Sequence, residues 1–231
     1  MVMPGGRYVA TNVTLRRLVR TAYSVQDSQV AGGPPWIDSD RFDVVATANV
    51  NNPAATFREQ FRPMLATLLR ERFKLSLHRE KRELAAFALV VSRRDGRFGP
   101  KLVSADADCA AVGPASRGGP PAPDLNRRLP CGAWYSQPGR LTGRVEFGRF
   151  VDTLAPLVDR PVVDLTSLKG RFEWDLQWTP SALSATDLAP AADGATSLFT
   201  ALAEQLGLKL DARKLPVDVL VVDRAEHLAR N

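Results

Sequence analysis

Hydrophobic residues recur along the chain with two different periods, and each period predicts a different kind of element. After Thr14, apolar residues recur at helical spacing, which predicts an amphipathic helix capped by the threonine hydroxyl. Between positions 172 and 178, apolar residues alternate with polar ones, which predicts a strand with one buried face. Helical spacing returns over 57–73, which predicts a second helix. The apolar positions of the first two segments are Leu15, Leu18, Val19 and Ala22, and Phe172, Trp174, Leu176 and Trp178.

This order of patterns occurs twice, with matching segments about 130 residues apart. Each copy is predicted to contain a strand, a helix, two strands, a second helix and a final hairpin of two strands. The sequence therefore predicts an α+β fold that arose by tandem duplication, with helices packed on small mixed sheets and a pseudo-twofold axis. The matching segments are 6–8 with 139–141, 12–19 with 144–151, 41–44 with 171–174, 71–77 with 204–210 and 89–91 with 220–222.

Composition divides the chain into three parts. Residues 1–95 are predicted to form the first repeat unit, and residues 139–231 the second. Residues 96–138 are rich in glycine, proline, alanine and aspartate, which predicts an exposed linker centred on the run GGPPAP. A further loop is expected over Thr179–Thr196. The expected hairpins pair Leu75–Arg79 with Ala86–Ser92, and Leu208–Ala212 with Val217–Asp223.

Both cysteines, Cys109 and Cys131, lie in the predicted linker and lack the spacing and the histidines of a zinc site. We predict a disulfide between them, worth about 3 kcal/mol of lost chain entropy in the unfolded state; two free thiols are the alternative. A disulfide indicates an extracytoplasmic location, periplasmic or secreted. The first residues lack the apolar centre of a signal peptide, so we expect that a leader, with or without an opening strand, is missing from this chain.

Positive charge is unevenly distributed. The net charge is +6 and the isoelectric point is about 9.7. The basic stretch 70–94 could bind nucleic acid weakly, but no aromatic residues interleave it, which favours an ordinary solvated surface. Trp36, Trp174 and Trp178 are predicted to be core residues rather than a stacking platform.

A search for catalytic chemistry yields weak candidates. The sequence has no G-x-S-x-G motif and no phosphate-binding loop. His78 is expected at the surface of a strand, and His227 in a frayed tail. The acidic residues of each copy fit turns and caps better than a Ca²⁺ loop, so neither a metal nor a cofactor is predicted. These acidic residues are Asp38, Asp40 and Asp43 in the first copy, and Asp159, Asp164, Glu173 and Asp175 in the second.

Five runs of residues carry a family resemblance: GGRYVATNVTLRRLVRTAYSVQDSQVAGGPPWIDSDRFDV, LLRERFKLSLHREKRELAAFALVV, GRLTG, RPVVDLTSLKGRFEWDLQWTP and SLFTALAEQLGLKLDARKLPVDVLVVDRAEH. They resemble a family of uncharacterised proteins that is expanded in soil Acidobacteria. The resemblance implies an exported protein, in some members placed after a membrane metallopeptidase of the beta-lactam sensor kind, and it assigns no catalytic residues. The order of elements in a single copy is also similar to the short N-terminal modules of secretins and TonB-dependent receptors, which bind proteins through sheet edges.

These observations favour a binding or protein-interaction module over an enzyme, with a role in envelope sensing as one hypothesis. The ligand, a protein or a small molecule, and the oligomeric state stay open, and no membrane span is expected. The alternatives are a hydrolase with a site in the groove between the copies and weak nucleic-acid binding through 70–94. The hydrolase hypothesis places Asp43 or Asp175 beside Arg41 or Arg171 as its catalytic groups.

Overall fold

The structure is a computed structural model that describes residues 2–3, 7–47, 57–93, 96–110, 128–180 and 196–227. The centre of the predicted linker and most of the loop predicted over Thr179–Thr196 lie outside these residues. The chain divides into two compact units, which are described separately. Unit 1 comprises Met1–Leu84, Arg117–Gly119 and Pro216–Asn231, and unit 2 comprises Ala85–Ser116 and Pro120–Leu215.

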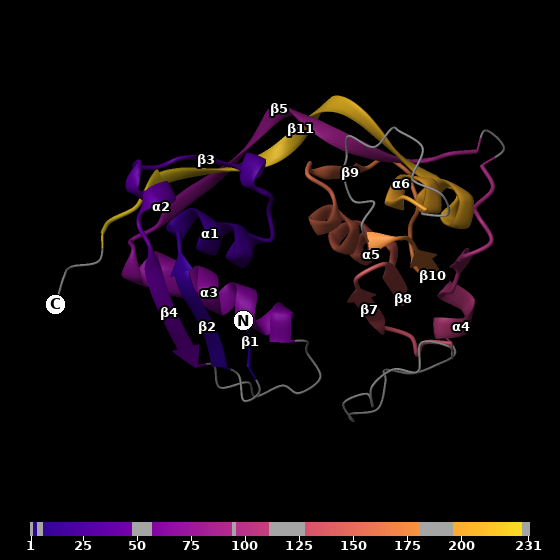
Figure 1. The fold of residues 1–231 in the computed structure, drawn as a ribbon, viewed down its shortest axis with the longest axis horizontal. Helices are drawn as coiled ribbons and strands as arrows, with labels where there is room; N and C mark the ends of the chain where they lie inside the picture. Colours follow the sequence, from indigo (N-terminus) through magenta and orange to yellow (C-terminus); the bar gives the residue numbers. More distant parts are fainter. Residues whose placement is uncertain are drawn as a thin grey trace. The chain divides into compact units, whose positions relative to one another are not determined.

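Unit 1 contains an antiparallel sheet with the strand order β1-β2-β4 (Figure 1). The predicted cap is confirmed, because the Thr14 hydroxyl accepts a hydrogen bond from the backbone N–H of Arg17 at 3.2 Å and the first helix begins at Leu15. The elements of unit 1 are β1 (Val2–Met3), β2 (Arg7–Val13), α1 (Leu15–Tyr23), η1 (Asp27–Gln29), β3 (Val30–Gly32), α2 (Trp36–Ser39), β4 (Phe42–Thr47) and α3 (Phe57–Arg72).

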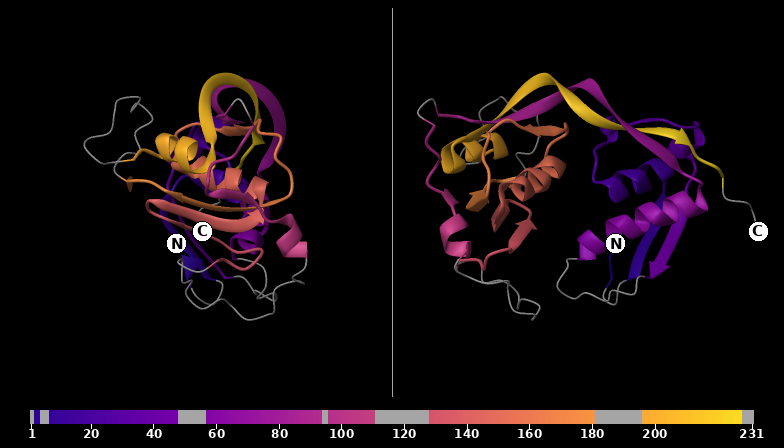
Figure 2. Two further views of the ribbon diagram at one scale, coloured as in Figure 1. Left: turned by 90° about the vertical axis from the view of Figure 1, so that its right-hand side faces the viewer. Right: turned by 180° about the vertical axis from the view of Figure 1, so that it is seen from behind.

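The core of unit 1 lies where α1 and α3 cover one face of β2 and β4. Seen from behind, α3 lies in front of these strands (Figure 2). The ring of Tyr8 on β2 lies 4.2 Å from that of Phe61 on α3, and Leu18 and Leu69 are buried between the layers. Trp36 packs against the same cluster, so its predicted role as a core residue holds. The apolar stripe of each helix thus meets the inward face of the sheet.

Unit 2 contains an antiparallel sheet with the strand order β6-β10-β8-β7. Its helices end as the sequence indicates: α5 gives way to a short 3-10 turn that contains Pro156, and the last helix ends at Gly207, which has a φ of +70°. The elements are β6 (Leu102–Ser104), α4 (Asp106–Ala110), β7 (Trp134–Gln137), β8 (Arg140–Glu146), α5 (Phe147–Leu154), η2 (Ala155–Leu157), β9 (Val162–Asp164), β10 (Arg171–Gln177), α6 (Leu198–Ala201) and the π-helical turn η4 (Leu202–Leu206).

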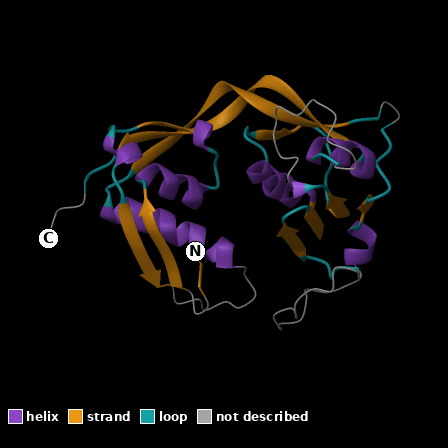
Figure 3. Ribbon diagram, in the orientation of Figure 1, coloured by secondary structure: helices purple, strands orange, loops and turns teal. Residues whose placement is uncertain are grey.

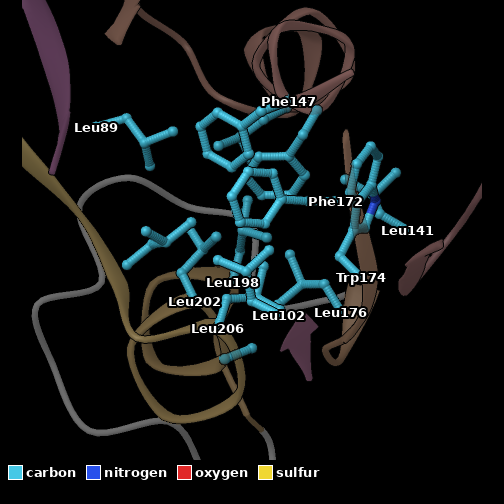
Figure 4. Close-up of a cluster of buried hydrophobic side chains, with 14 of the residues drawn as sticks. Leu89, Leu102, Leu141, Phe147, Phe172, Trp174, Leu176, Leu198, Leu202 and Leu206 are labelled. Atoms are coloured by element: carbon cyan, nitrogen blue, oxygen red, sulfur yellow. The ribbon is translucent and has the colours of Figure 1, made fainter. Parts of the chain in front are cut away.

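The core of unit 2 is formed by aromatic residues of α5 and β10 and by leucines of the last helix (Figure 4). Trp174 and Trp178 are buried, which confirms the period-two prediction for this strand and the core role of both tryptophans. The ring of Phe147 lies 5.5 Å from that of Phe172, in an edge-to-face arrangement. Leu89, which lies early in the chain, is fully buried in this cluster.

The two predicted hairpins are wrong, because each hairpin region forms one long strand (Figure 3). β5 (Ser76–Val91) has 16 residues and β11 (Leu208–Arg224) has 17. The contacts His78–Asp223 and Ser92–Gly207 lie near opposite ends of the two strands, so β5 and β11 run antiparallel. The division between the two units falls within both strands, at Leu84 on β5 and at Leu215 on β11.

One segment of each long strand pairs with a short parallel strand of the same unit. In unit 1, β3 pairs with β11, with Val30 opposite Leu220. In unit 2, β9 pairs with β5, with Val162 opposite Phe87. The sheet order is therefore β3-β11-β5-β9, and each unit is completed by a strand segment that lies far away in the sequence.

The linker prediction needs correction over two segments. β6 and α4 lie within residues 96–138, as does β7, and both strands belong to the sheet of unit 2. Leu102 is buried, and burial of its apolar side chain stabilises this short strand in the sheet. The predicted disulfide is confirmed: Cys109 on α4 is bonded to Cys131.

The predicted fold class is confirmed as α+β, with helices packed on small sheets. Within the described residues, no helix is long and apolar enough to cross a membrane. Both halves of the chain show the order strand, helix, strand, strand, helix, long strand: β2-α1-β3-β4-α3-β5, and then β8-α5-β9-β10-α6-β11, apart from the short additional elements.

Candidate binding site

In unit 1, the two catalytic candidates hold a bulge in the backbone. Asn12 has a φ of +55°, and the register between β2 and β4 shifts between Ala10 and Val13. The Asp43 carboxylate accepts a hydrogen bond from the backbone N–H of Asn12 at 2.8 Å, and Arg41 donates to its carbonyl at 3.5 Å. These contacts stabilise the strand pairing, and they give Asp43 no partner suited to proton transfer.

In unit 2, the structure does not pair Asp175 with Arg171. The Asp175 carboxylate accepts two hydrogen bonds from Arg140 on β8, at 2.7 and 3.0 Å. Arg171 forms an ion pair with Glu146, at 3.3 Å between Nε and Oε1. Residues of β8 thus engage both candidates, and the Arg140–Asp175 pair has the fork geometry that arginine forms with a carboxylate.

The expectation that His227 frays is wrong. Its ring lies 4.4 Å from that of Trp36, and Nε2 lies 2.6 Å from an oxygen of Asp40. The backbone N–H of Glu226 donates to the carbonyl of Phe73 at 2.7 Å and thereby ties down the same segment. Hydrogen bonds from Ser39 and His227 hold the pKa of Asp40 below its ordinary value.

The other singled-out polar groups lie at surface contacts and turns. His78 is half exposed, and Nδ1 lies 2.7 Å from Asp223. Asp164 accepts hydrogen bonds from the backbone N–H and the hydroxyl of Thr166, as an Asx turn does. Among the described residues, no group of three or more histidine, cysteine or acidic side chains could hold a metal ion. Nucleic-acid binding through 70–94 stays a prediction.

An unpaired strand edge is the feature that sequence reasoning missed. β4 is the last strand of its sheet, and within the described part of the chain no strand pairs with its outer side. Its sequence, FDVVAT, contains one charged residue and is rich in β-branched residues. Val45 is 61% exposed on it. Such an edge is a template for the addition of another strand.

The long strands β5 and β11 carry protection that β4 lacks, in the stretches that lie beyond their pairing with β9 and β3. The residues of β5 between His78 and Glu83 are nearly all charged and mostly exposed. β11 carries Lys209, Arg213 and Lys214, and Pro216 lies within the same strand. β6 and β7 have only three and four residues. Charge, proline and short length are the usual means by which proteins prevent a sheet edge from pairing.

In the sheet of unit 2, β10 has a neighbour on each side, β8 and β6. β6 pairs antiparallel with β10, and Leu102 lies opposite Trp174. The backbone N–H groups of Arg171 and Asp175 point toward this added segment: they donate to Asp106 Oδ1 at 2.7 Å and to the carbonyl of Lys101 at 3.3 Å. The sheet of unit 2 therefore shows in detail how an extra strand lies along such an edge.

Comparison with known proteins gives one match. No curated protein and no solved structure matches the chain. A family model described as a protein of unknown function, DUF3738, matches residues 16–225. This range begins within α1 and takes in every later helix and strand, the disulfide and the edge of β4, and the chain belongs to the DUF3738 family.

Proposed function

We propose that the protein is a binding module that takes up an extended polypeptide segment as an additional strand along β4. The observation that carries this proposal is the outer edge of β4, which has Asp43 as its one charged residue and Val45 61% exposed, whereas the stretch of β5 beyond its pairing with β9 is densely charged. Binding of this kind gains affinity from main-chain hydrogen bonds and specificity from alternate side chains. The site residues are Phe42–Thr47.

The proposal is supported by a second one, that the two halves of the chain are copies of one unit. Corresponding strands pair at corresponding positions, both in the antiparallel sheets and where a short strand joins a long one. The corresponding pairs are Val13–Phe42 with Val145–Phe172, and Val30–Leu220 with Val162–Phe87. On this basis β4 corresponds to β10, and its open edge corresponds to the edge that β6 covers.

We place this activity outside the cytoplasm. The Cys109–Cys131 disulfide supports an exported protein, since thiols stay reduced in most cytosols. Capture of an extended segment at the cell envelope suits a sensing role, in which an exposed or unfolded segment of another protein is the signal.

The test is selection of linear peptides from a random library on the disulfide-bonded chain. By its correspondence with Asp175, the backbone N–H of Val45 faces the open edge, so Val45→Pro should remove a donor to the ligand without breaking the pairing with β2. Selected peptides should bind Val45→Pro at least about tenfold more weakly than Val45→Thr, which keeps both the N–H and the branched side chain.

A second measurement does not depend on a folded proline variant. In the wild-type chain, a selected peptide should slow hydrogen exchange of the Val45 amide. Equal binding to the proline and threonine variants, or unchanged exchange at Val45 with peptide bound, would rule out β4 as the site.

A further inference from the structure

The site on β4 also specifies the direction, the register and the charge of its ligand. This inference rests on the proposed function and uses unit 2 as the template. On β10 the added strand runs antiparallel, with Leu102, Val103 and Ser104 opposite Trp174, Glu173 and Phe172. Leu102 is 3% exposed and belongs to the core cluster, whereas Val103 is 53% exposed on the outer face. Alternate residues of the added strand therefore have opposite environments.

Transfer of this register to unit 1 places three ligand residues opposite Val44, Asp43 and Phe42. The residue opposite Val44 would point toward the inner face, where Val44 is buried and Phe42 lies 5.0 Å from the ring of Phe73. Valine is much smaller than the tryptophan of β10, so this position suits a large apolar side chain.

The surroundings of the inner position agree in the two units. In unit 2, Phe98 lies 5.9 Å from Phe172, beside the strand that β6 joins. In unit 1, the ring of His227 lies 6.2 Å from Phe42. An aromatic ring thus lies near Phe172 on β10 and near Phe42 on β4, and an apolar side chain of the ligand would pack beside the ring in unit 1.

The outer position differs between the two units in its charge. Glu173 is neutralised in unit 2, because Arg128 donates to it at 2.7 Å and Arg144 Nε lies 3.5 Å from the same oxygen. An uncharged residue opposite it, Val103, leaves no charge unpaired. In unit 1, Asp43 accepts a backbone hydrogen bond from Asn12, and among the described residues no arginine or lysine forms an ion pair with it.

We infer that the ligand of β4 is an extended segment of a partner polypeptide that runs antiparallel to β4 and carries, in order, a large apolar residue, a lysine or arginine, and a small residue. The apolar residue lies opposite Val44 and the cation opposite Asp43. A cross-strand pair of opposite charges adds specificity to binding that is otherwise made by the main chain.

The probe for this inference is the chain's own edge strand, supplied as a peptide. The peptide has the sequence of residues 100–105, Pro-Lys-Leu-Val-Ser-Ala, with both ends capped, and its partner carries Val103→Lys. In an NMR titration of the full chain, the lysine peptide should bind about threefold more tightly than the valine peptide. In the variant Asp43→Asn, which keeps the side-chain oxygen that Asn12 needs, the two peptides should bind within about 1.5-fold of one another.

Direction is tested with a nitroxide label. On an antiparallel peptide, a label at the N-terminus should broaden the amide signal of Thr47, and a label at the C-terminus that of Phe42. The reverse pattern would overturn the assigned direction. Equal binding of the two peptides to wild-type protein, or an unchanged lysine preference in Asp43→Asn, would overturn the assigned charge.

These failures are distinct from failure of the proposed function. Library peptides that depend on the Val45 amide but show no preference for the predicted pattern would leave β4 as a binding edge and remove this inference. A concentration-dependent dimer in sedimentation, abolished by Val45→Pro, would show that a second copy of the chain covers the edge, and it would overturn the partner segment.

Discussion

Two leucines far apart in the sequence, Leu89 and Leu220, provide a decisive test of how the two units are built. If β5 and β11 are continuous strands, Leu89 belongs to the core of unit 2 and Leu220 to the core of unit 1. If each folded back as a hairpin, the assignments would be reversed. Leu89→Ala should therefore loosen unit 2, and Leu220→Ala should loosen unit 1.

The magnitude follows from burial. Leu89 is 0% exposed and Leu220 is 2% exposed, so each truncation removes a fully buried side chain. Loss of transfer free energy and the cavity left behind together cost about 3 kcal/mol, within the usual span of about 2–5 kcal/mol for buried leucines. Since about 1.4 kcal/mol is a factor of ten, protection of the core amides should fall about a hundredfold.

Native-state hydrogen exchange resolves the two units. In Leu89→Ala, protection should fall most at Trp174 on β10, and in Leu220→Ala most at Val44 on β4. Val90→Ala is the matched control, because Val90 faces the opposite side of β5 and is only partly buried. A Leu89→Ala protein that lost protection at Val44 and kept it at Trp174 would refute the continuous strands.

Three smaller effects follow from the contacts around the sheets. Replacing Cys109 and Cys131 together by alanine should lower the free energy of unfolding by about 3 kcal/mol in urea, because the disulfide closes a sequence separation of 22 residues; an unchanged urea midpoint would contradict this. The folded-state pKa of Asp40 lies below its ordinary 3.8, so its stabilising contribution is present above that pH and is lost as the pH falls through the folded-state pKa. Ser39→Ala should then raise the Asp40 midpoint in a carbon-13 NMR titration, whereas a fixed midpoint would exclude the hydrogen bond as the cause. Asp175→Asn should cost no more than about 1 kcal/mol in thermal unfolding, because the pair with Arg140 is partly exposed; a larger loss would show that the ion pair is a core interaction.

The local sequence pattern is sufficient to predict an element that forms its own backbone hydrogen bonds, as a helix does, or that has one solvent-exposed face, as a half-buried strand does. The helix after Thr14 and the strand over Phe172–Trp178 were predicted from period and capping alone, and both are present. The disulfide was predictable for a different reason: the chain has two cysteines, so one pairing exists.

The prediction of hairpins is wrong because a charged interval in a strand resembles a turn in the sequence. The segment between Leu77 and Ala85 is polar, and a polar interval between apolar runs resembles a loop. It contains no glycine, asparagine or proline, and a tight two-residue turn needs residues that tolerate positive φ. The charges instead cover a strand edge, which is a tertiary requirement that no local window contains.

The same reasoning explains why the sequence does not reveal the proposed binding edge, although it draws attention to Asp43 on it. Asp43 stood out as a carboxylate near an arginine, and sequence alone assigned it to acid–base chemistry. In the structure, the surroundings of an acid on an edge depend on which strands have neighbours. On β10, two arginines contact Glu173 and β6 pairs with the outer side of the strand. On β4, Asp43 accepts one backbone hydrogen bond beside an edge that no described strand covers. On the proposal that the two halves are copies of one unit, they differ at one acid and one edge, and this difference favours a site for a ligand over a requirement of the fold.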